Sequence, residues 1–343
     1  MVNADTRRNG DKLLLKSIVL LYINKIFISV KRLVIALGGN ALLRKGEKGT
    51  LENQFKNAEV TAKEIVDLAL KNYKIVVTHG NGPQVGNIYL QQELVADKVP
   101  PMALDACGAM SQGLIGYILT VAILNELIKR GAADYTVVTI VTHVIVDDKD
   151  PAFKNPSKPI GLYYTEEEAM RILKEKKWAL KPDPRGGWRR VVPSPRPLKI
   201  LEAPIIRDLV ERDKTIVIAC GGGGIPLIFK DGKLKGVEAV IDKDLTSAKI
   251  AVDIKADILL ILTDVEKVAL NYGKPNQQWI DSMTVSEARR YISEGHFAPG
   301  SMLPKVVASI EFVEASGERA IITKLGKALK ALLGETGTHI VRG

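Results

Sequence analysis

The chain has 343 residues, of which 46% are apolar, and its net charge at pH 7 is +10. This length and apolar content provide for a sizeable core and exclude a largely disordered chain. Residues 1–32 hold seven basic and two acidic side chains, so half of the excess charge lies there; the mildly basic remainder suits small anionic substrates and does not require a nucleic acid.

Residues 1–30 are expected to form an N-terminal extension outside the organised fold. Residues 13–30 are apolar, but Lys16 and Lys25 interrupt them, so they do not supply the roughly 20 apolar residues of a membrane span. The basic start resembles that of a signal peptide, yet no small-residue cleavage site follows. Three interpretations stay open: a dispensable extension or start-site artefact before a start at Val30, an amphipathic surface helix, or a signal.

Short apolar runs that end in glycine predict the first strands. Residues 33–40 are five apolar residues followed by Gly-Gly-Asn, which is typical of a strand buried on both faces. Residues 74–78 lead into His-Gly-Asn-Gly, and residues 215–219 lead into a cysteine and four consecutive glycines. Glycine lets backbone N–H groups approach an anion closely, although a tight turn would explain any single case. Repeated at several strand ends, the pattern predicts a phosphate site at the carboxyl edge of a parallel sheet.

The remaining patterns alternate between helix and strand. Helices are expected over residues 51–72, 85–95, 110–130, 166–177, 202–212, 286–294 and 300–315, and further strands over 136–146, 257–263, 319–323 and 338–341. This alternation predicts an α/β sandwich with a mostly parallel central sheet. The helix over 110–130 and the residues before it are rich in small side chains, which favours close packing in the core or across a dimer.

Residues 148–197 interrupt the alternation. They are rich in proline and charge and contain two tryptophans, Trp178 and Trp188. Such a segment is typical of a small protruding subdomain inserted in the main fold, and we call it the lid. A surface excursion without a role has the same composition. Lys158 stands in this lid, followed by two tyrosines.

Charged residues next to the predicted phosphate site indicate its chemistry. Asp242, Lys243 and Asp244 follow a strand end and open a helix, while Lys305 lies in the first turn of another. A lysine there opposes the helix dipole, which is reasonable if it meets an anion. The alternative interpretation is that Asp242, Lys243 and Asp244 form an exposed charge cluster. The P-loop, dinucleotide and protein-kinase fingerprints are absent, so the sequence predicts a phosphate-binding enzyme of another class.

Six ordered motifs then carry a family resemblance. They read L-G-G-N at 37–40, T-H-G-N-G-P-Q-V-G at 78–86, S-Q-G-L-I-G-Y at 111–117, A-C-G-G-G-G-I-P at 219–226, I-D-K-D-L-T-S-A at 241–248 and F-A-P-G-S-M-L-P-K at 297–305. Over residues 31–343 the chain resembles the carbamate kinase family of the amino acid kinase superfamily. The resemblance implies a three-layer αβα sandwich, a homodimer, a cytoplasmic location and a place in arginine metabolism. It also implies the reversible conversion of ATP and carbamate to ADP and carbamoyl phosphate, with Mg²⁺.

By the same resemblance, Lys243 and Lys305 contact the ATP phosphates and stabilise the transition state. Asp244 orients these lysines, Asp242 is a second candidate nearby, and Lys158 is a third lysine delivered by the lid. Carbamate and the transferring phosphoryl group would be held by Gly38, Gly39, Asn40, Gly80, Asn81 and Gly82. Nucleotide would be contacted by Gly221, Gly222, Gly223, Gly224, Asp242, Thr263, Asp264 and Val265. No residue is assigned as a metal ligand.

Other functions fit the sequence less well. A kinase for acetylglutamate or aspartate would need a side-chain pocket that the sequence does not show, and an inactive nucleotide sensor would not need Lys243, Asp244 and Lys305 together. No covalent nucleophile is required, because carbamate itself attacks. Cys107 and Cys220 are therefore expected to be structural; far apart and unaccompanied, they suit a reducing compartment and support neither a disulfide framework nor a zinc site. Neither a nucleic-acid nor a membrane partner is expected.

Overall fold

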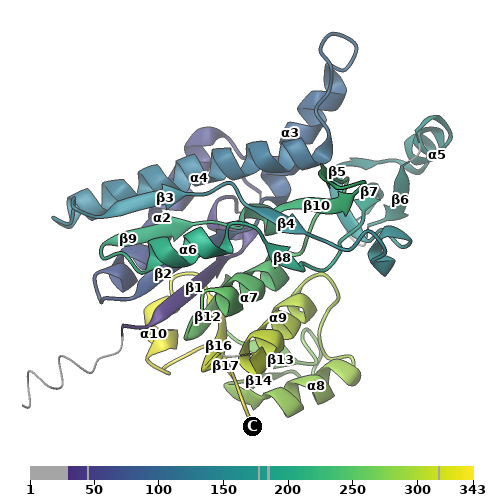
Figure 1. Ribbon diagram of the computed structural model, residues 1–343. Helices are drawn as coiled ribbons and strands as arrows, with labels where there is room; N and C mark the ends of the chain where they lie inside the picture. Colours follow the sequence, from purple (N-terminus) through teal and green to yellow (C-terminus); the bar gives the residue numbers. More distant parts are fainter. Residues whose placement is uncertain (1–29, 45, 177, 184–185, 316) are drawn as a thin grey trace, which may run out of the picture. The chain divides into compact units, whose positions relative to one another are not determined.

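An eight-stranded sheet forms the centre of the fold, in the order β15-β17-β16-β12-β1-β2-β9-β3 (Figure 1). The computed structural model describes residues 30–44, 46–176, 178–183, 186–315 and 317–343, so apart from Val30 the expected N-terminal extension lies outside the described residues. The strands in chain order are β1 (Arg32–Leu37), β2 (Lys74–His79), β3 (Thr136–Thr139), β9 (Thr215–Ile218), β12 (Ile258–Thr263), β15 (Ser282–Thr284), β16 (Arg319–Lys324) and β17 (Thr338–Val341). Neighbours pair in parallel except β16 and β17.

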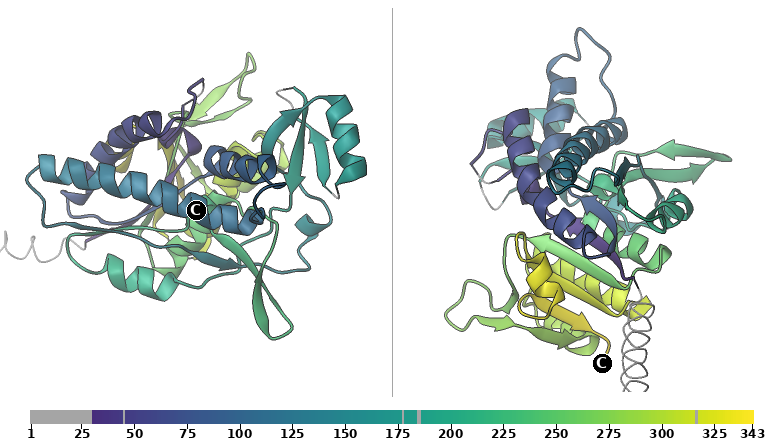
Figure 2. Two further views of the ribbon diagram at one scale, coloured as in Figure 1. Left: turned by 90° about the horizontal axis from the view of Figure 1, so that it is seen from above. Right: turned by 90° about the vertical axis from the view of Figure 1, so that its left-hand side faces the viewer.

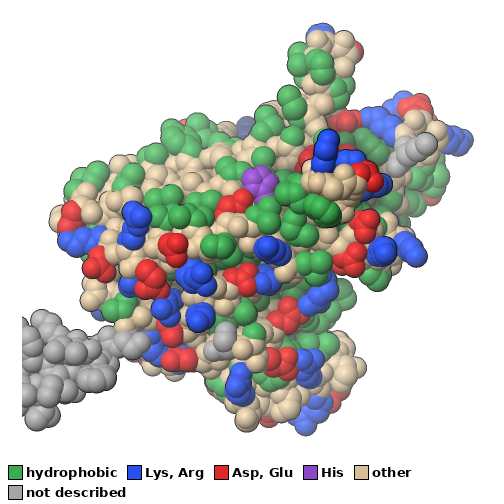
Figure 3. Space-filling view, in the orientation of Figure 1, with side chains coloured by type: hydrophobic (Ala, Val, Ile, Leu, Met, Phe, Trp, Pro, Cys, Tyr) green, Lys and Arg blue, Asp and Glu red, His purple; other side chains and the backbone are tan. Residues whose placement is uncertain are grey.

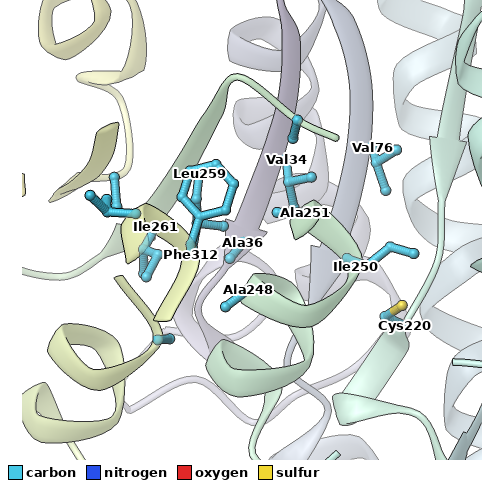
Figure 4. Close-up of a cluster of buried hydrophobic side chains, with 14 of the residues drawn as sticks. Val34, Ala36, Val76, Cys220, Ala248, Ile250, Ala251, Leu259, Ile261 and Phe312 are labelled. Carbon is cyan, nitrogen blue, oxygen red and sulfur yellow. The ribbon is translucent and has the colours of Figure 1, made fainter. Parts of the chain in front are cut away.

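Helices cover both faces of this sheet (Figure 2). One face carries α2 (Leu51–Ala69), α4 (Leu104–Lys129) and α10 (Ala328–Leu332); the other carries α6 (Ala203–Val210), α7 (Lys243–Asp253), α8 (Val285–Ser293) and α9 (Met302–Ala315). Strand β1 shows why two layers are needed, because its alternate side chains enter opposite cores. Val34 and Ala36 pack with α7 and α9 (Figure 4), whereas Leu33, Ile35 and Leu37 pack with α2 and α4. The expected three-layer αβα sandwich with a mostly parallel sheet is confirmed.

The lid folds around a three-stranded antiparallel sheet in the order β5-β7-β6. It consists of the short helix η2 (Pro151–Phe153), β5 (Lys158–Tyr164), α5 (Glu166–Glu175), β6 (Ala179–Pro182) and β7 (Trp188–Val192). Ile160 and Val192 of this sheet join a small apolar cluster with residues of α3 (Gly82–Leu94) and α4. The lid is therefore seated on α3 through buried side chains, and the two lie next to each other in Figures 1 and 2.

The single strand expected over residues 136–146 is wrong. The chain leaves the central sheet after β3, and β4 (His143–Ile145) belongs to a second sheet, β11-β10-β4-β8. At the break, the Gln112 side chain takes the place of a strand partner, because it donates to the Thr142 carbonyl over 3.1 Å and accepts from the Thr142 N–H over 2.8 Å. The other strands of that sheet, β8 (Lys199–Ile200), β10 (Ile225–Lys230) and β11 (Lys233–Gly236), and the hairpin of β13 (Val268–Leu270) and β14 (Gln278–Ile280), were not expected.

Helix α4 begins at Leu104, six residues earlier than the small-residue pattern indicates, because Leu104 and Cys107 are buried in the cluster beneath the lid. Within the described residues it is the one helix long and apolar enough to cross a membrane. Half of its most apolar window is buried inside the fold, and Ile115, Leu119 and Ile123 belong to the core against α2. Figure 3 shows basic and acidic side chains interspersed on the face in view, without a basic stripe.

Candidate active site

The candidate active site lies where β1, β2 and β12 end and α7 and α9 begin. A cavity of about 200 Å³ opens there, lined by Gly38, Gly39, Ala41, Lys243, Leu262, Thr263, Asp264, Gly300, Ser301, Lys305 and Leu325. The carboxyl ends of parallel strands leave backbone groups unpaired, and helix starts add N–H groups that also lack partners. The edge of the sheet thus combines free donors with two lysines, which suits an anion.

Asp244 links the two lysines of this cavity. Its carboxylate lies in the first turn of α7, is 3% exposed, and accepts from Lys305 Nζ over 3.0 Å through Oδ2. Its other oxygen, Oδ1, accepts from Lys243 Nζ. Both lysine side chains are largely buried. One buried carboxylate therefore fixes two ammonium groups that come from different helices.

The charges of this triad depend on one another. Burial alone would raise the pKa of Asp244, but Lys243 and Lys305 outweigh burial and lower that pKa to about 2. Burial lowers the pKa of the Lys243 ammonium, and Asp244 opposes the shift. Two cations around one carboxylate leave the triad with a net positive charge, which suits a further anion beside the lysines.

Asp242 joins the lid to the same helix. It caps α7 by accepting the Asp244 N–H through Oδ1 over 2.9 Å, and its Oδ2 accepts from Lys158 Nζ over 2.9 Å. Lys158 and Asp242 line a second cavity of about 640 Å³ between the lid, α7 and α9, and Gly300 borders both cavities. The third lysine is thus held at the edge of the site by a carboxylate two residues from Asp244.

The first two glycine loops lie against the lysines. Gly38 leaves β1 with its N–H donated to Leu262 O over 3.0 Å, and an added Cβ would stand 3.1 Å from that oxygen. Gly80 follows β2, where an added Cβ would stand 3.6 Å from Lys243 Cδ and 3.7 Å from the Gly39 nitrogen. The backbone of these loops can approach the lysines because no side chain intervenes.

The third loop, Gly221–Gly223 with Gly224, is closely packed against other parts of the chain. These four glycines do not line the cavity that contains the lysines. An added Cβ would instead collide with protein atoms at each of them, in order His79, Asn81, the Ile241 backbone and Val144. The observed need for glycine here is close packing of the loop against β2 and the start of α7.

The structure brings most of the predicted residues to one edge of the sheet. Gly38, Gly39, Lys243, Thr263, Asp264 and Lys305 line one cavity, Lys158 and Asp242 line the other, and Asp244 and Gly80 lie directly behind Lys243. Asn81 donates instead to Ser111 Oγ over 2.8 Å, and Gly82 begins α3. Asn40 has its backbone in the short helix η1 (Gly39–Ala41), and Val265 is not among the lining residues.

Gly300 and Ser301 were missed as site residues. They lie at the end of the loop before α9 and line the cavity beside Lys305. The signal was present, since both belong to the motif at 297–305 that places Lys305. Gly300 has no side chain, however, and Ser301 carries no charge that would single it out.

Protein metal ligands are not clustered in the described parts of the chain, where no group of three or more His, Cys, Asp or Glu residues could hold an ion. Mg²⁺ in kinases is held mainly by phosphates and water with one or two carboxylates. Asp264, which lines the cavity and accepts from its neighbour Thr263 over 3.0 Å, is a carboxylate of this kind. The residues present fit a divalent ion that arrives with a nucleotide.

Comparison with known proteins identifies the family. A sequence model of the amino acid kinase family matches residues 31–324. The carbamate kinases of Thermococcus kodakarensis and Pyrococcus furiosus are 55% and 53% identical to this chain, covering 91% of it and 100% and 99% of their own lengths. The structure of carbamate kinase from Giardia lamblia bound to AMP-PNP superposes with a TM-score of 0.86 at 46% identity, over 92% of this chain and 99% of that one. The chain therefore belongs to the amino acid kinase family and, within it, to the carbamate kinases.

Proposed function

We propose that the cavity around Lys243 and Lys305 is where this enzyme transfers a phosphoryl group from ATP to carbamate, giving ADP and carbamoyl phosphate. Membership of the carbamate kinases supports the reaction. The observation that supports the location is the buried carboxylate of Asp244 between the two lysines at the glycine-ended strands. The reaction runs in either direction at one site, since the reverse reaction uses the same groups.

The chemistry needs no covalent intermediate. A carboxylate oxygen of carbamate forms a bond to the γ-phosphorus of ATP while the bond to the β–γ bridging oxygen breaks, and ADP leaves with that electron pair. No proton has to move. Negative charge spreads over the transferring group, so its neutralisation is the main task of the protein. In the proposal, Lys243 and Lys305 neutralise it, and Asp244 holds them in place beforehand.

The glycine loops and the lid complete the proposed site. Backbone N–H groups of Gly38 and Gly39, together with Asn40 and the loop at Gly80, Asn81 and Gly82, would hold carbamate and the transferring phosphoryl group. Thr263 and Asp264 would face the nucleotide, with Val265 beside them. Gly221–Gly223 and Gly224 would contact the nucleotide phosphates through their backbone, as the resemblance implies. Residues 148–197 would act as the lid that presents Lys158.

A divalent ion would accompany the nucleotide, and Asp264, a carboxylate of the cavity lining, would help to hold it. When bound, Mg²⁺ would neutralise phosphate charge and fix the orientation of the phosphate chain. The protein residues retain separate roles, because Lys243 and Lys305 are bonded to Asp244 and not arranged as metal ligands.

The proposal includes a homodimer in the cytoplasm that acts in arginine metabolism, as the family resemblance implies. The two cysteines support a reducing compartment, since Cys107 and Cys220 are both free and buried. Burial raises the pKa of each thiol, which suits a structural role. Sedimentation of the purified chain at several concentrations tests the dimer.

A coupled assay tests the proposed function directly. The full chain is incubated with ADP and carbamoyl phosphate, and separately with ATP plus acetylglutamate, aspartate or UMP. We expect ATP to form from the first pair and no phosphorylation of the other acceptors. Turnover of acetylglutamate or aspartate with none of carbamoyl phosphate would overturn the proposal in favour of an amino-acid carboxylate as substrate.

A further inference from the structure

Arg190 connects the lid to the body of the enzyme at two points, Glu238 and Tyr89. It lies on β7, the central strand of the lid sheet, and is 4% exposed. Its Nη2 donates to Glu238 Oε2 over 2.8 Å, and its Nη1 donates to the hydroxyl of Tyr89 on α3. Burying a guanidinium is costly unless it is paired and hydrogen-bonded, and here the partners lie on two other segments.

Two aromatic rings enclose this guanidinium. The Arg190 Cζ atom stands 4.2 Å from the centre of the Trp178 ring and 5.0 Å from that of Tyr89, and the two rings are 6.2 Å apart. The Tyr89 hydroxyl accepts from Arg190 and donates to Glu93 Oε1 over 3.0 Å, while Lys176 pairs with Glu93. Stacking and hydrogen bonding in two directions require a planar fork of donors, which lysine does not have.

The lid sheet transmits the position of Arg190 to Lys158. Strand β7 pairs with β5 so that Arg190 stands opposite Ile160 and Val192 stands opposite Lys158. Ile160 and Val192 are themselves buried in the cluster with α3 and α4. Moving the β7 strand would therefore carry Lys158 with it.

On the body of the enzyme, the segment that Arg190 contacts also leads to the Lys158–Asp242 pair. Glu238 is four residues before Asp242, the partner of Lys158. Between them, the Val240 N–H donates to the Pro193 carbonyl of the lid over 2.9 Å. Arg190 thus binds the segment that ends at Asp242, and through the lid sheet it also fixes the strand that carries Lys158. One guanidinium therefore contacts the segments of both residues of the Lys158–Asp242 pair.

We propose that Arg190 is a positioning residue for phosphoryl transfer, which seats the lid on α3 and on the segment before Asp242 so that Lys158 is held at the edge of the active site. This inference rests on the proposed function for the role of Lys158. It assigns to Arg190 no contact with substrate. Arg190 affects the rate only by positioning Lys158. An experiment can therefore separate this effect from a general loss of stability.

A double-mutant cycle tests the pathway. Arg190→Met should lower kcat on the order of 10–100-fold, because misplacement of a reacting group by about 1 Å has effects of that size. It should leave KM for ATP nearly unchanged, since the cavity with Thr263 and Asp264 is not lined by the lid. In a Lys158→Ala background, the same Arg190→Met change should alter kcat by no more than about twofold. Equal losses in both backgrounds would overturn the inference.

Two further variants cover the case in which Arg190→Met folds poorly. Arg190→Lys keeps the charge and loses the planar fork, and Glu238→Gln removes a half-exposed partner of the pair. Both should show a smaller loss of kcat with the same dependence on Lys158. Arg171→Met provides the matched control, because Arg171 is an exposed arginine of the lid helix α5. It should behave like the wild type in every assay.

Amide hydrogen exchange gives a readout that does not depend on activity. Arg190→Met and Arg190→Lys should speed exchange in β5 and β7 relative to the wild type, with β1 and β2 unchanged. Exchange that is unaltered in β5 would overturn the inference even if the rate falls. If the wild type fails to make ATP from carbamoyl phosphate, the proposed function fails, and the exchange data still decide whether Arg190 seats the lid.

Discussion

Lys305 and Asp244 are 61 residues apart in the chain, and the structure joins them by a 3.0 Å hydrogen bond from Nζ to Oδ2. Each lies near the start of a helix, Asp244 in α7 and Lys305 in α9. The carboxylate is favoured at such a helix start, whereas the lysine is not. The bond gives Lys305 a partner that keeps its charge directed toward the cavity lined by the glycine loops.

The first prediction concerns the two lysines. Lys305→Ala and Lys243→Ala should each lower the rate of ATP formation on the order of 10²–10³-fold, because each removes a fixed donor for charge that develops in the transition state. Lys249→Ala is the matched control, since Lys249 lies on α7, pairs with Asp253 and does not line the cavity. The measurement is the steady-state rate of ATP formation by each variant, after circular dichroism has shown that the variant is folded. Rates like those of Lys249→Ala would refute the assignment.

The second prediction concerns Asp244→Asn. This change leaves two largely buried ammonium groups without their counter-charge, and breaking a buried pair in this way costs about 3–5 kcal/mol of unfolding free energy. The wild-type pKa of about 2 lies below the ordinary value of 3.8, so Asp244 stabilises the fold above pH 3.8 and loses this effect as pH falls toward 2. Urea unfolding between pH 2 and 7 should show that loss in the wild type and not in the variant.

How much the sequence predicts depends on whether a signal is local. The strand β1 and its glycines were predictable, because an apolar run closed by Gly38 and Gly39 has one simple interpretation in an α/β fold. Lys243 and Lys305 were predictable from their places at helix starts. Their common bond to Asp244 was supplied by the family resemblance, since no local pattern records a contact across 61 residues.

The wrong prediction of one strand over residues 136–146 has the same physical origin. At the break between β3 and β4 the hydrogen-bond partner is the Gln112 side chain, which comes from a helix distant in the sequence. The residues from 136 to 146 themselves therefore contain no pattern that predicts the break. The four glycines after β9 were predicted to contact nucleotide phosphate, and this stays a prediction; what the structure adds is that His79, Asn81 and Val144 fill the space where side chains would stand at Gly221, Gly222 and Gly224. Glycine signals a close approach, but sequence alone does not tell whether a ligand or another part of the chain approaches.

The third prediction concerns pH and His79. This side chain is 2% exposed, and burial lowers its pKa to about 4, with Lys243 adding to the shift. Between pH 4 and the unfolded value of 6.5 the unfolded chain binds more protons, so the free energy of unfolding rises with pH across that window. The shift corresponds to about 3 kcal/mol. His79→Gln should reduce the difference in unfolding free energy between pH 4.5 and 7; an unchanged difference would show that other groups cause it.

The fourth prediction compares two glycines with similar backbones. Gly222 has φ +64° and Gly232 has φ +74°, so alanine at either site meets the left-handed strain of roughly 1–2 kcal/mol. They differ in what surrounds them, because an added Cβ at Gly222 would overlap the Asn81 amide, whereas nothing lies within 4 Å at Gly232.

Gly222→Ala should therefore destabilise the fold by about 1–3 kcal/mol more than Gly232→Ala, the usual cost of overpacking. It should also slow phosphoryl transfer, since Asn81 must move and loses the 2.8 Å bond that its Nδ2 donates to Ser111. Gly232→Ala, in the turn between β10 and β11, should leave the rate unchanged. Thermal unfolding and the coupled assay measure the two effects. Equal stability of the two variants would mean that the loop after β9 has room to yield, and that packing does not explain why it is glycine.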